Sequence, residues 1–166
     1  MNDAIVFMGV AGCGKSSIAQ LVAQTEGYLF IEGDGFHSAA NRDKMAQGIA
    51  LTDEDRAEWL SQLGEEIRKH PNGLVLTCSA LKKAYRDQLR QSAPALKFVF
   101  LDIAKDESLR RVSARGNGHF FPAALVDNQF ATLESPVGEA GVLRLDATEP
   151  LEVLRQQVVV WLHAGD

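Results

Sequence analysis

Cysteine and excess positive charge are both scarce in this chain of 166 residues. Its two cysteines, Cys13 and Cys78, make neither a disulfide framework nor a zinc-ligand spacing, so we expect both to stay reduced. The formal net charge of −5 argues against a general nucleic-acid-binding protein, which would normally carry a basic patch or stripe. We therefore expect no nucleic-acid partner.

Long apolar runs are also absent. No stretch approaches the length of a membrane span, and the first residues, MNDAIVFMGV, do not have the basic and then apolar pattern of a secretory signal. We expect a cytoplasmic protein with no membrane partner. An apolar content of 46% over this length is enough to bury one substantial core, which predicts a single domain over residues 1–166.

What the chain does have is five short apolar runs separated by segments long enough for helices. The runs cover residues 4–8, 28–31, 74–78, 98–101 and 142–145. Apolar residues recur at helical spacing between and after them, as at Ile18, Leu21 and Val22. This alternation predicts an α/β fold built on a parallel sheet flanked by helices.

The first run leads directly into a glycine-rich loop, GVAGCGKSS, which satisfies the pattern G-x-x-x-x-G-K-[ST] in full. In such a P-loop the backbone N–H groups close around the β-phosphate of a nucleotide, Lys15 reaches the β- and γ-phosphate oxygens, and Ser16 can hold Mg²⁺. A predicted strand before the loop and a helical pattern after it favour this interpretation over a chance match. The predicted nucleotide-binding residues are Gly9, Val10, Ala11, Gly12, Cys13, Gly14, Lys15, Ser16 and Ser17.

Two classes of P-loop protein lose support from the rest of the chain. No guanine-reading N-K-x-D follows a later strand, which disfavours a GTP switch. The third predicted strand ends in Thr77-Cys78-Ser79 and not in an acidic pair, which disfavours an ATPase motor. A small P-loop kinase remains.

Asp34 lies in EGDGFH, just past the second predicted strand, where ligands of open parallel sheets bind. One carboxylate there can align an acceptor hydroxyl and take its proton, which is most of what phosphoryl transfer requires of a base. The alternative is a turn or helix-cap residue between two glycines; the position favours catalysis. His37 is either a structural histidine or a contact of the acceptor.

The next segment, NRDKMAQGIALTDEDRAEWL, offers further polar side chains. Thr52 and Asp55 form a capping-box pattern that begins a helix and explains the acidic run without a functional role. Asn41, Lys44 and Arg56 could instead donate hydrogen bonds to an acceptor that carries hydroxyls and a negative charge.

Two later pairs of basic residues are four apart. Ser79 is placed to cap a helix on which Lys82 and Arg86 share one face, either as a solvated face or as an anion site. Arg111 and Arg115 precede a Gly/Asn-rich break, and are either exposed or able to close over the nucleotide as part of a flap.

Together these blocks resemble the small bacterial-type gluconate kinases, within the nucleoside-monophosphate-kinase-like group of P-loop proteins. The resemblance runs from Ala4 to about Pro150 and rests on GVAGCGKSS, EGDGFH, N-x-x-K-M, D-R-x-x-W-L, CSALK-x-x-Y-R-D-x-L-R, GHFF and QFATLESP. It implies transfer of phosphate from ATP, with Mg²⁺, to the terminal hydroxyl of D-gluconate, often by a homodimer.

The resemblance also implies the strand order 2-3-1-4-5 and a small helical lid over roughly residues 111–135. The spacing from Arg115 to His119 is one residue longer than is usual in the family, which bears on the lid and on His119 as a substrate contact. Other function classes stay open: a kinase for shikimate, adenylyl sulfate or a nucleotide, and a nucleotide-binding regulatory module without turnover.

Overall fold

The protein folds around one parallel sheet, seen in a computed structural model that describes residues 3–114 and 123–164. The strands are β1 (Ala4–Met8), β2 (Leu29–Glu32), β3 (Leu74–Thr77), β4 (Lys97–Asp102) and β5 (Val142–Asp146), and they lie in the order β2-β3-β1-β4-β5. Every pairing is parallel. The predicted fold class and strand order are therefore confirmed, and each predicted apolar run overlaps a strand.

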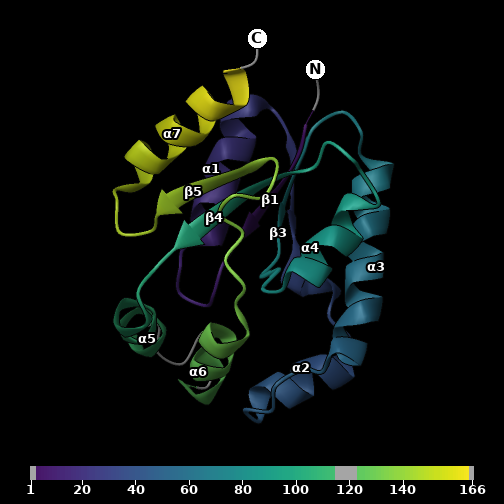
Figure 1. Ribbon diagram of the computed structural model, residues 1–166, viewed down its shortest axis with the longest axis vertical. Helices are drawn as coiled ribbons and strands as arrows, with labels where there is room; N and C mark the ends of the chain where they lie inside the picture. Colours follow the sequence, from purple (N-terminus) through teal and green to yellow (C-terminus); the bar gives the residue numbers. More distant parts are fainter. Residues whose placement is uncertain (1–2, 115–122, 165–166) are drawn as a thin grey trace.

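Helices cover both faces of the sheet and surround the carboxyl ends of its strands (Figure 1). α1 and α7 lie on one face, α3 and α4 lie on the other, and α2, α5 and α6 lie beyond the strand ends. Their bounds are α1 Lys15–Glu26, α2 Ala39–Ala46, α3 Asp53–Lys69, α4 Lys83–Arg90, α5 Lys105–Ala114, α6 Ala123–Thr132 and α7 Leu151–His163, with a 3₁₀ helix, η1, at Gly33–Phe36.

The central strand β1 shows why its sequence is a continuous apolar run. Ile5 and Phe7 pack in the layer of α1 and α7. Val6 and Met8 pack in the layer of α3 and α4. Because successive side chains point to opposite faces and both faces are covered, no position from residue 5 to residue 8 can be polar without burying an unpaired group.

The start of α3 is as predicted, whereas that of α4 is not. Thr52 accepts a hydrogen bond from the backbone of Asp55 and the Asp55 carboxylate accepts one from the backbone of Thr52, a complete capping box. The prediction that Ser79 caps the next helix is wrong, since α4 begins only after Lys82. Ala80 has a φ of +47°, in the left-handed region, so the right-handed helix α4 cannot include it.

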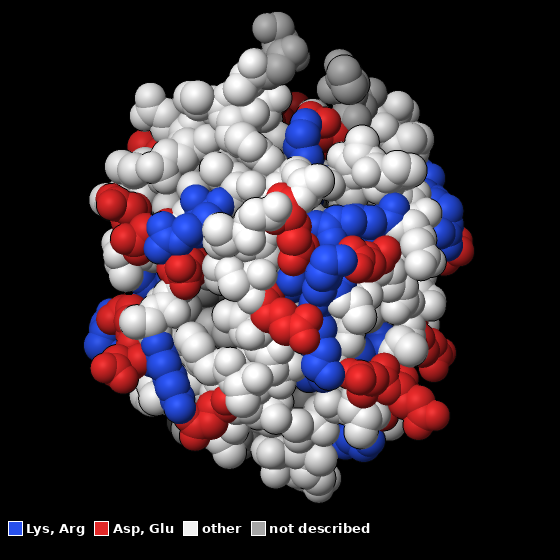
Figure 2. Space-filling view, in the orientation of Figure 1, with Lys and Arg blue, Asp and Glu red and all other residues white. Residues whose placement is uncertain are grey.

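Two surface properties complete the description. On the face shown in Figure 2, Lys and Arg side chains are interspersed with Asp and Glu side chains. Within the described ranges, none of the helices combines the length and the apolar character that a membrane crossing requires.

Candidate active site

A cavity of about 910 Å³ lies at the carboxyl ends of β1, β2 and β3. The P-loop forms one wall, the ends of β2 and β3 form its floor, and side chains from α2, α3 and α6 complete it. Open parallel sheets bind their ligands at this edge, because there the loops diverge and helix N-termini point inward.

The P-loop owes its shape to its glycines. Gly14 has a φ of +87° and is the N-cap of α1, which has no side-chain cap, so the first N–H groups of the helix stay available to an anion. A Cβ atom on Gly9 would lie 2.8 Å from Cys13 Sγ and 3.0 Å from the Leu101 carbonyl oxygen. The motif therefore requires glycine for close packing as well as for backbone conformation.

Lys15, the first residue of α1, lines the cavity together with Glu32 and Asp34. Burial alone would lower the pKa of the Lys15 ammonium, but negative groups around it, the Asp34 and Glu32 carboxylates included, hold that pKa above its usual value. Lys15 is therefore a fixed positive charge at physiological pH, as a ligand of phosphate oxygens must be.

Glu32 is a site residue that the sequence analysis missed. Its Oε1 accepts hydrogen bonds of 2.8 Å from the hydroxyls of Ser16 and Thr77. The Thr77 hydroxyl in turn accepts a hydrogen bond from the backbone of Gly33. The available signal was a carboxylate at the end of a predicted strand, two residues before Asp34.

The pair of Ser16 and Glu32 fits Mg²⁺ in its chemistry, because both residues present oxygen ligands. Among the residues that the structure describes, no three His, Cys, Asp or Glu side chains gather as a metal site. That is compatible with Mg²⁺, which is commonly held by one or two protein oxygens together with substrate phosphates.

Asp34 is held at the cavity by its neighbour Gly33. A Cβ atom on Gly33 would lie 1.9 Å from the Thr77 carbonyl oxygen, so only glycine lets the chain leave β2 this close to β3. The Gly33 carbonyl accepts a 2.8 Å hydrogen bond from the Trp59 indole, which fastens η1 to α3. The Asp34 carboxylate thus stands on a short, anchored turn.

His37 is buried against Trp59, with ring centroids 4.0 Å apart and an interplanar angle of 21°. Its Nδ1 lies 3.4 Å from the amide nitrogen of Asn41. Burial lowers the pKa of His37, the Arg42 and Arg56 cations lower it further, and Asp34 opposes them. The imidazole is therefore neutral at pH 7 and can exchange hydrogen bonds with hydroxyl groups.

Two arginines line the cavity, one predicted and one missed. Arg56 donates a 3.0 Å hydrogen bond to the Tyr85 hydroxyl and lies over that ring, 5.4 Å from its centroid. Arg42 lines the cavity from α2 and donates a 2.8 Å hydrogen bond to the Gly35 carbonyl. In the sequence alone, Arg42 could not be told from a surface residue of a polar helix.

Three other predicted substrate residues lie outside the cavity lining and bind other groups of the protein. The Asn41 amide donates a 3.0 Å hydrogen bond to the Asp55 carbonyl. Lys44 pairs with the Asp55 carboxylate at 2.8 Å. Lys82 pairs with Asp53 at 3.1 Å.

Arg86 requires a correction, because neither predicted alternative fits it. It is fully buried, so it is not part of a solvated face, and it does not line the cavity. Its guanidinium binds Glu139 and three backbone carbonyls. It shares no basic face with Lys82, which lies before the helix that contains Arg86.

The structure places only one of the three residues predicted around the flap, which are Arg111 and Arg115 for the nucleotide and His119 for the substrate. Arg111 lies beside the P-loop, where it donates a 3.1 Å hydrogen bond to the Gly12 carbonyl and a 3.0 Å hydrogen bond to the Ala147 carbonyl. Arg115 and His119 lie outside the described residues.

α6 adds a wall that the sequence analysis did not anticipate. Leu125, Asn128 and Gln129 line the cavity from this helix. The Gln129 amide oxygen accepts a 2.7 Å hydrogen bond from the backbone N–H of Ala11, in the P-loop. The QFATLESP block was visible in the sequence, but its contact with the P-loop, 118 residues away, was not.

The two cysteines next to the site, Cys13 and Cys78, are free and buried. Burial raises the pKa of the Cys78 thiol to about 12, against opposing contributions from a backbone hydrogen bond and from Lys15. The Cys78 thiolate is therefore not available as a nucleophile near neutral pH.

A P-loop, a carboxylate on an anchored turn and cationic side chains around one cavity define a P-loop kinase that acts on a small polar molecule. Residues 5–136 match the family described as "AAA domain". A gluconokinase of Gluconobacter oxydans is 41% identical over 98% of this chain and 92% of its own length, and the thermosensitive gluconokinase of Escherichia coli is 40% identical over 94% and 85%.

Solved structures agree with this match. A gluconokinase from Sinorhizobium meliloti has a TM-score of 0.89 at 43% identity, over 96% of this chain and 91% of its own. An adenylyl-sulfate (APS) kinase of Mycobacterium tuberculosis shares the fold alone, at 22% identity and a TM-score of 0.68, over 97% of each chain. The chain belongs to the gluconokinase family, as the sequence resemblance predicted.

Proposed function

We propose that this protein transfers the γ-phosphate of ATP to the terminal hydroxyl of D-gluconate and so forms 6-phosphogluconate. The observation that carries the proposal is one cavity that contains the P-loop lysine, the Asp34 carboxylate and two arginines. The family membership supports gluconate as the acceptor, since the curated relatives are named for that activity.

The nucleotide end of the cavity consists of the P-loop. Its backbone N–H groups and Lys15 would bind the phosphates, and Arg111, next to Gly12, would add positive charge beside them. Ser16 and Glu32 would hold Mg²⁺, which neutralises charge on the phosphates when bound. These groups supply positioning and charge stabilisation, which dominate catalysis of phosphoryl transfer.

The acceptor end has a base and a charge clamp. Asp34 would align the terminal hydroxyl of gluconate and accept its proton as the bond to phosphorus forms. Arg42 and Arg56 would bind the carboxylate at the other end of the molecule, and neutral His37 would hydrogen-bond a hydroxyl between them. An acceptor with a hydroxyl at one end and a negative charge at the other matches this order of groups.

The remaining predicted substrate residues would not touch the acceptor and would instead hold the residues that do. Asn41 contacts His37 and therefore holds its ring. Lys44 and Lys82 pair with the acidic residues Asp55 and Asp53 in the first turn of α3, the helix that carries Arg56. We also propose that Arg115 and His119 belong to a lid over roughly residues 111–135, and that the enzyme is a cytoplasmic homodimer.

The test is ADP release measured with purified protein, ATP and Mg²⁺ against a panel of acceptors. We expect release with gluconate alone of the panel, and none with shikimate, adenylyl sulfate or nucleoside monophosphates. Release with another acceptor would replace the substrate, and ATP binding with no acceptor-dependent release would identify a regulatory module. Lys15→Ala, which removes the P-loop charge, should abolish release and leave a cooperative thermal transition.

A further inference from the structure

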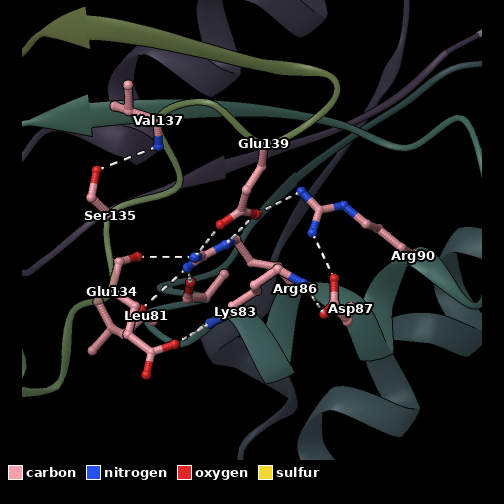
Figure 3. A network of polar contacts seen from close by, with 10 residues as sticks. Leu81, Lys83, Arg86, Asp87, Arg90, Glu134, Ser135, Val137 and Glu139 are labelled. Atoms are coloured by element: carbon pink, nitrogen blue, oxygen red, sulfur yellow. Dashed lines mark hydrogen bonds and ion pairs between the residues drawn. The ribbon is translucent and has the colours of Figure 1, made fainter.

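Arg86 is fully buried and uses every donor of its guanidinium group (Figure 3). Its Nε and Nη2 each donate one hydrogen bond to the Glu139 carboxylate, at 3.0 and 2.7 Å. The other three go to the carbonyls of Ala80, Leu81 and Glu134, at 2.8, 3.2 and 2.9 Å. With no donor left over, this side chain cannot bind a substrate unless the network opens.

The network joins two segments that are far apart in the sequence. Residues 80–81 follow β3 and adjoin Ser79, which lines the cavity. Residues 134–139 follow α6. The two segments also bond directly, because the Glu134 backbone donates to the Leu81 carbonyl at 2.7 Å. The Glu134 carboxylate in addition accepts a 2.8 Å hydrogen bond from the backbone of Lys83, the first residue of α4.

The second of these bonds also gives α4 its N-terminal cap. α4 has no capping side chain of its own, and the Glu134 carboxylate takes that place from another part of the chain. A negative charge at a helix N-terminus is favourable. The residues just after α6 are therefore fastened to α4 by hydrogen bonds and an ion pair.

α6 itself contacts α5, where Lys105 pairs with Asp127 at 2.6 Å, and the P-loop residue Ala11. Its N–H donates to Gln129 and its carbonyl accepts a 2.7 Å hydrogen bond from the buried hydroxyl of Ser108. Its methyl group packs with Val112 and the fully buried Val126. The position of α6 is thus set by α5, by the P-loop and, just past the C-terminal end of the helix, by the Arg86 network.

Stability alone is a weak explanation for this ion pair, because a buried pair is often no more stabilising than apolar residues of similar volume. The network also holds Ala80 in a left-handed conformation that a residue with a side chain adopts only at a cost. Both the buried ion pair and the left-handed Ala80 fix the geometry of the chain next to the cavity.

We propose that Arg86 and Glu139 are positioning residues for phosphoryl transfer, which clamp the end of α6 to the loop after β3 and thereby keep Gln129 on the Ala11 N–H and the α6 wall closed on the cavity. The catalytic consequence rests on the proposed kinase function, whereas the position of α6 does not. A small displacement of a supporting element can lower a rate by about 100-fold, because alignment of the reacting groups is lost.

The test uses Glu139→Gln, which keeps the shape of the side chain and removes its charge. We expect kcat to fall about tenfold to 100-fold with the KM for gluconate changed less than about twofold. A displaced α6 wall would admit water to the cavity, so ADP release without gluconate should rise relative to transfer. Amide hydrogen exchange in residues 123–132 should become faster.

Asp3→Asn is the matched control, since it removes the carboxylate charge of the 2.8 Å ion pair with Lys97 at the opposite end of the sheet. It should lower the melting temperature without changing kcat, the ratio of hydrolysis to transfer, or exchange in α6. Glu134→Gln, which weakens the cap on α4 and keeps the Arg86 pair, should shift all three quantities in the same direction as Glu139→Gln but less.

A double mutant identifies the route. If the network acts through Gln129, Glu139→Gln should reduce kcat little further in a Gln129→Met background, while the losses in melting temperature add. A Glu139→Gln variant that loses melting temperature but keeps kcat and the exchange of α6 would overturn the proposal, and so would rate losses that multiply in the double mutant.

Failure of the proposed function would look different. In that case the wild type itself would release no ADP with gluconate, and the kinetic comparisons would have no reference. The exchange of α6 amides in Glu139→Gln against Asp3→Asn would still decide whether the network holds this helix, and unchanged exchange would refute it.

Discussion

The Ser16 hydroxyl donates a 2.8 Å hydrogen bond to Oε1 of Glu32, and this bond joins the P-loop to the edge strand β2. The Thr77 hydroxyl, on β3 between the two, donates to the same oxygen. The residue that would hold Mg²⁺ is therefore oriented by a carboxylate that can itself take part in binding the ion.

Glu32→Gln should weaken the use of Mg²⁺. The amide keeps an acceptor oxygen for Ser16 and Thr77 but is a neutral ligand, which a hard divalent cation prefers less than a carboxylate. The Mg²⁺ concentration for half-maximal activity at fixed ATP should rise by roughly tenfold, about the low end of what loss of an outer metal contact costs. Glu65→Gln, on the exposed side of α3, is the charge-matched control. An equal Mg²⁺ requirement in both variants would show that Glu32 takes no part in binding Mg²⁺.

Arg56→Ala should raise the KM for gluconate and leave the KM for ATP nearly unchanged. Hydrogen bonds to a charged group contribute about 1.5 to 3 kcal/mol, which corresponds to roughly tenfold to 100-fold in affinity. Arg42→Ala should act in the same direction. Arg68→Ala, on the same helix as Arg56 but paired with exposed Glu65, provides the comparison. If Arg56→Ala and Arg42→Ala both keep the wild-type KM for gluconate, as Arg68→Ala should, the acceptor carboxylate binds elsewhere.

His37 should titrate below its ordinary value of 6.5, because burial and two nearby arginines disfavour the imidazolium. The unfolded state then binds more protons than the folded state as the pH falls below 6.5, so this residue contributes stability above that pH and loses it below. An NMR titration of the imidazole resonances gives the midpoint directly. Arg42→Ala should move that midpoint upward, and a midpoint at or above 6.5 in the wild type would contradict the site as described.

Asp34→Asn should lower kcat by about 10²- to 10⁴-fold, the usual loss on removal of a general base, with little change in ATP affinity. The amide keeps the shape of the side chain, so the melting temperature should stay near or slightly above that of the wild type. Stopped assays of ADP and calorimetric titration with ATP separate the two effects. Full kcat would make Asp34 a turn residue, and lost ATP binding would assign it to the metal.

The features that the sequence predicted are those written in consecutive residues. The P-loop pattern occupies eight adjacent positions, and a strand buried on both faces, such as β1, is an unbroken apolar run in the sequence. The capping box of Thr52 and Asp55 is equally local, and it formed as predicted.

Distant contacts decided the rest. Arg56 and Arg86 look alike in the sequence, since each is a basic residue near the start of a helix. Arg56 lines the cavity, whereas Arg86 is neutralised by Glu139, 53 residues further along the chain. The left-handed Ala80, which delays α4, depends on the same long-range network and has no local signal.

The most direct test of the account is the identity of the product. The ³¹P NMR spectrum of a reaction of wild-type protein with ATP, Mg²⁺ and gluconate, recorded without proton decoupling, reports which oxygen carries the phosphate. The account predicts a phosphomonoester triplet, because phosphate on the terminal hydroxyl couples over three bonds to the two protons of the terminal carbon. It also predicts that Asp34→Asn loses this signal. A doublet would place the phosphate on a secondary hydroxyl, and a singlet of inorganic phosphate alone would mean transfer to water; either result would contradict the assignment.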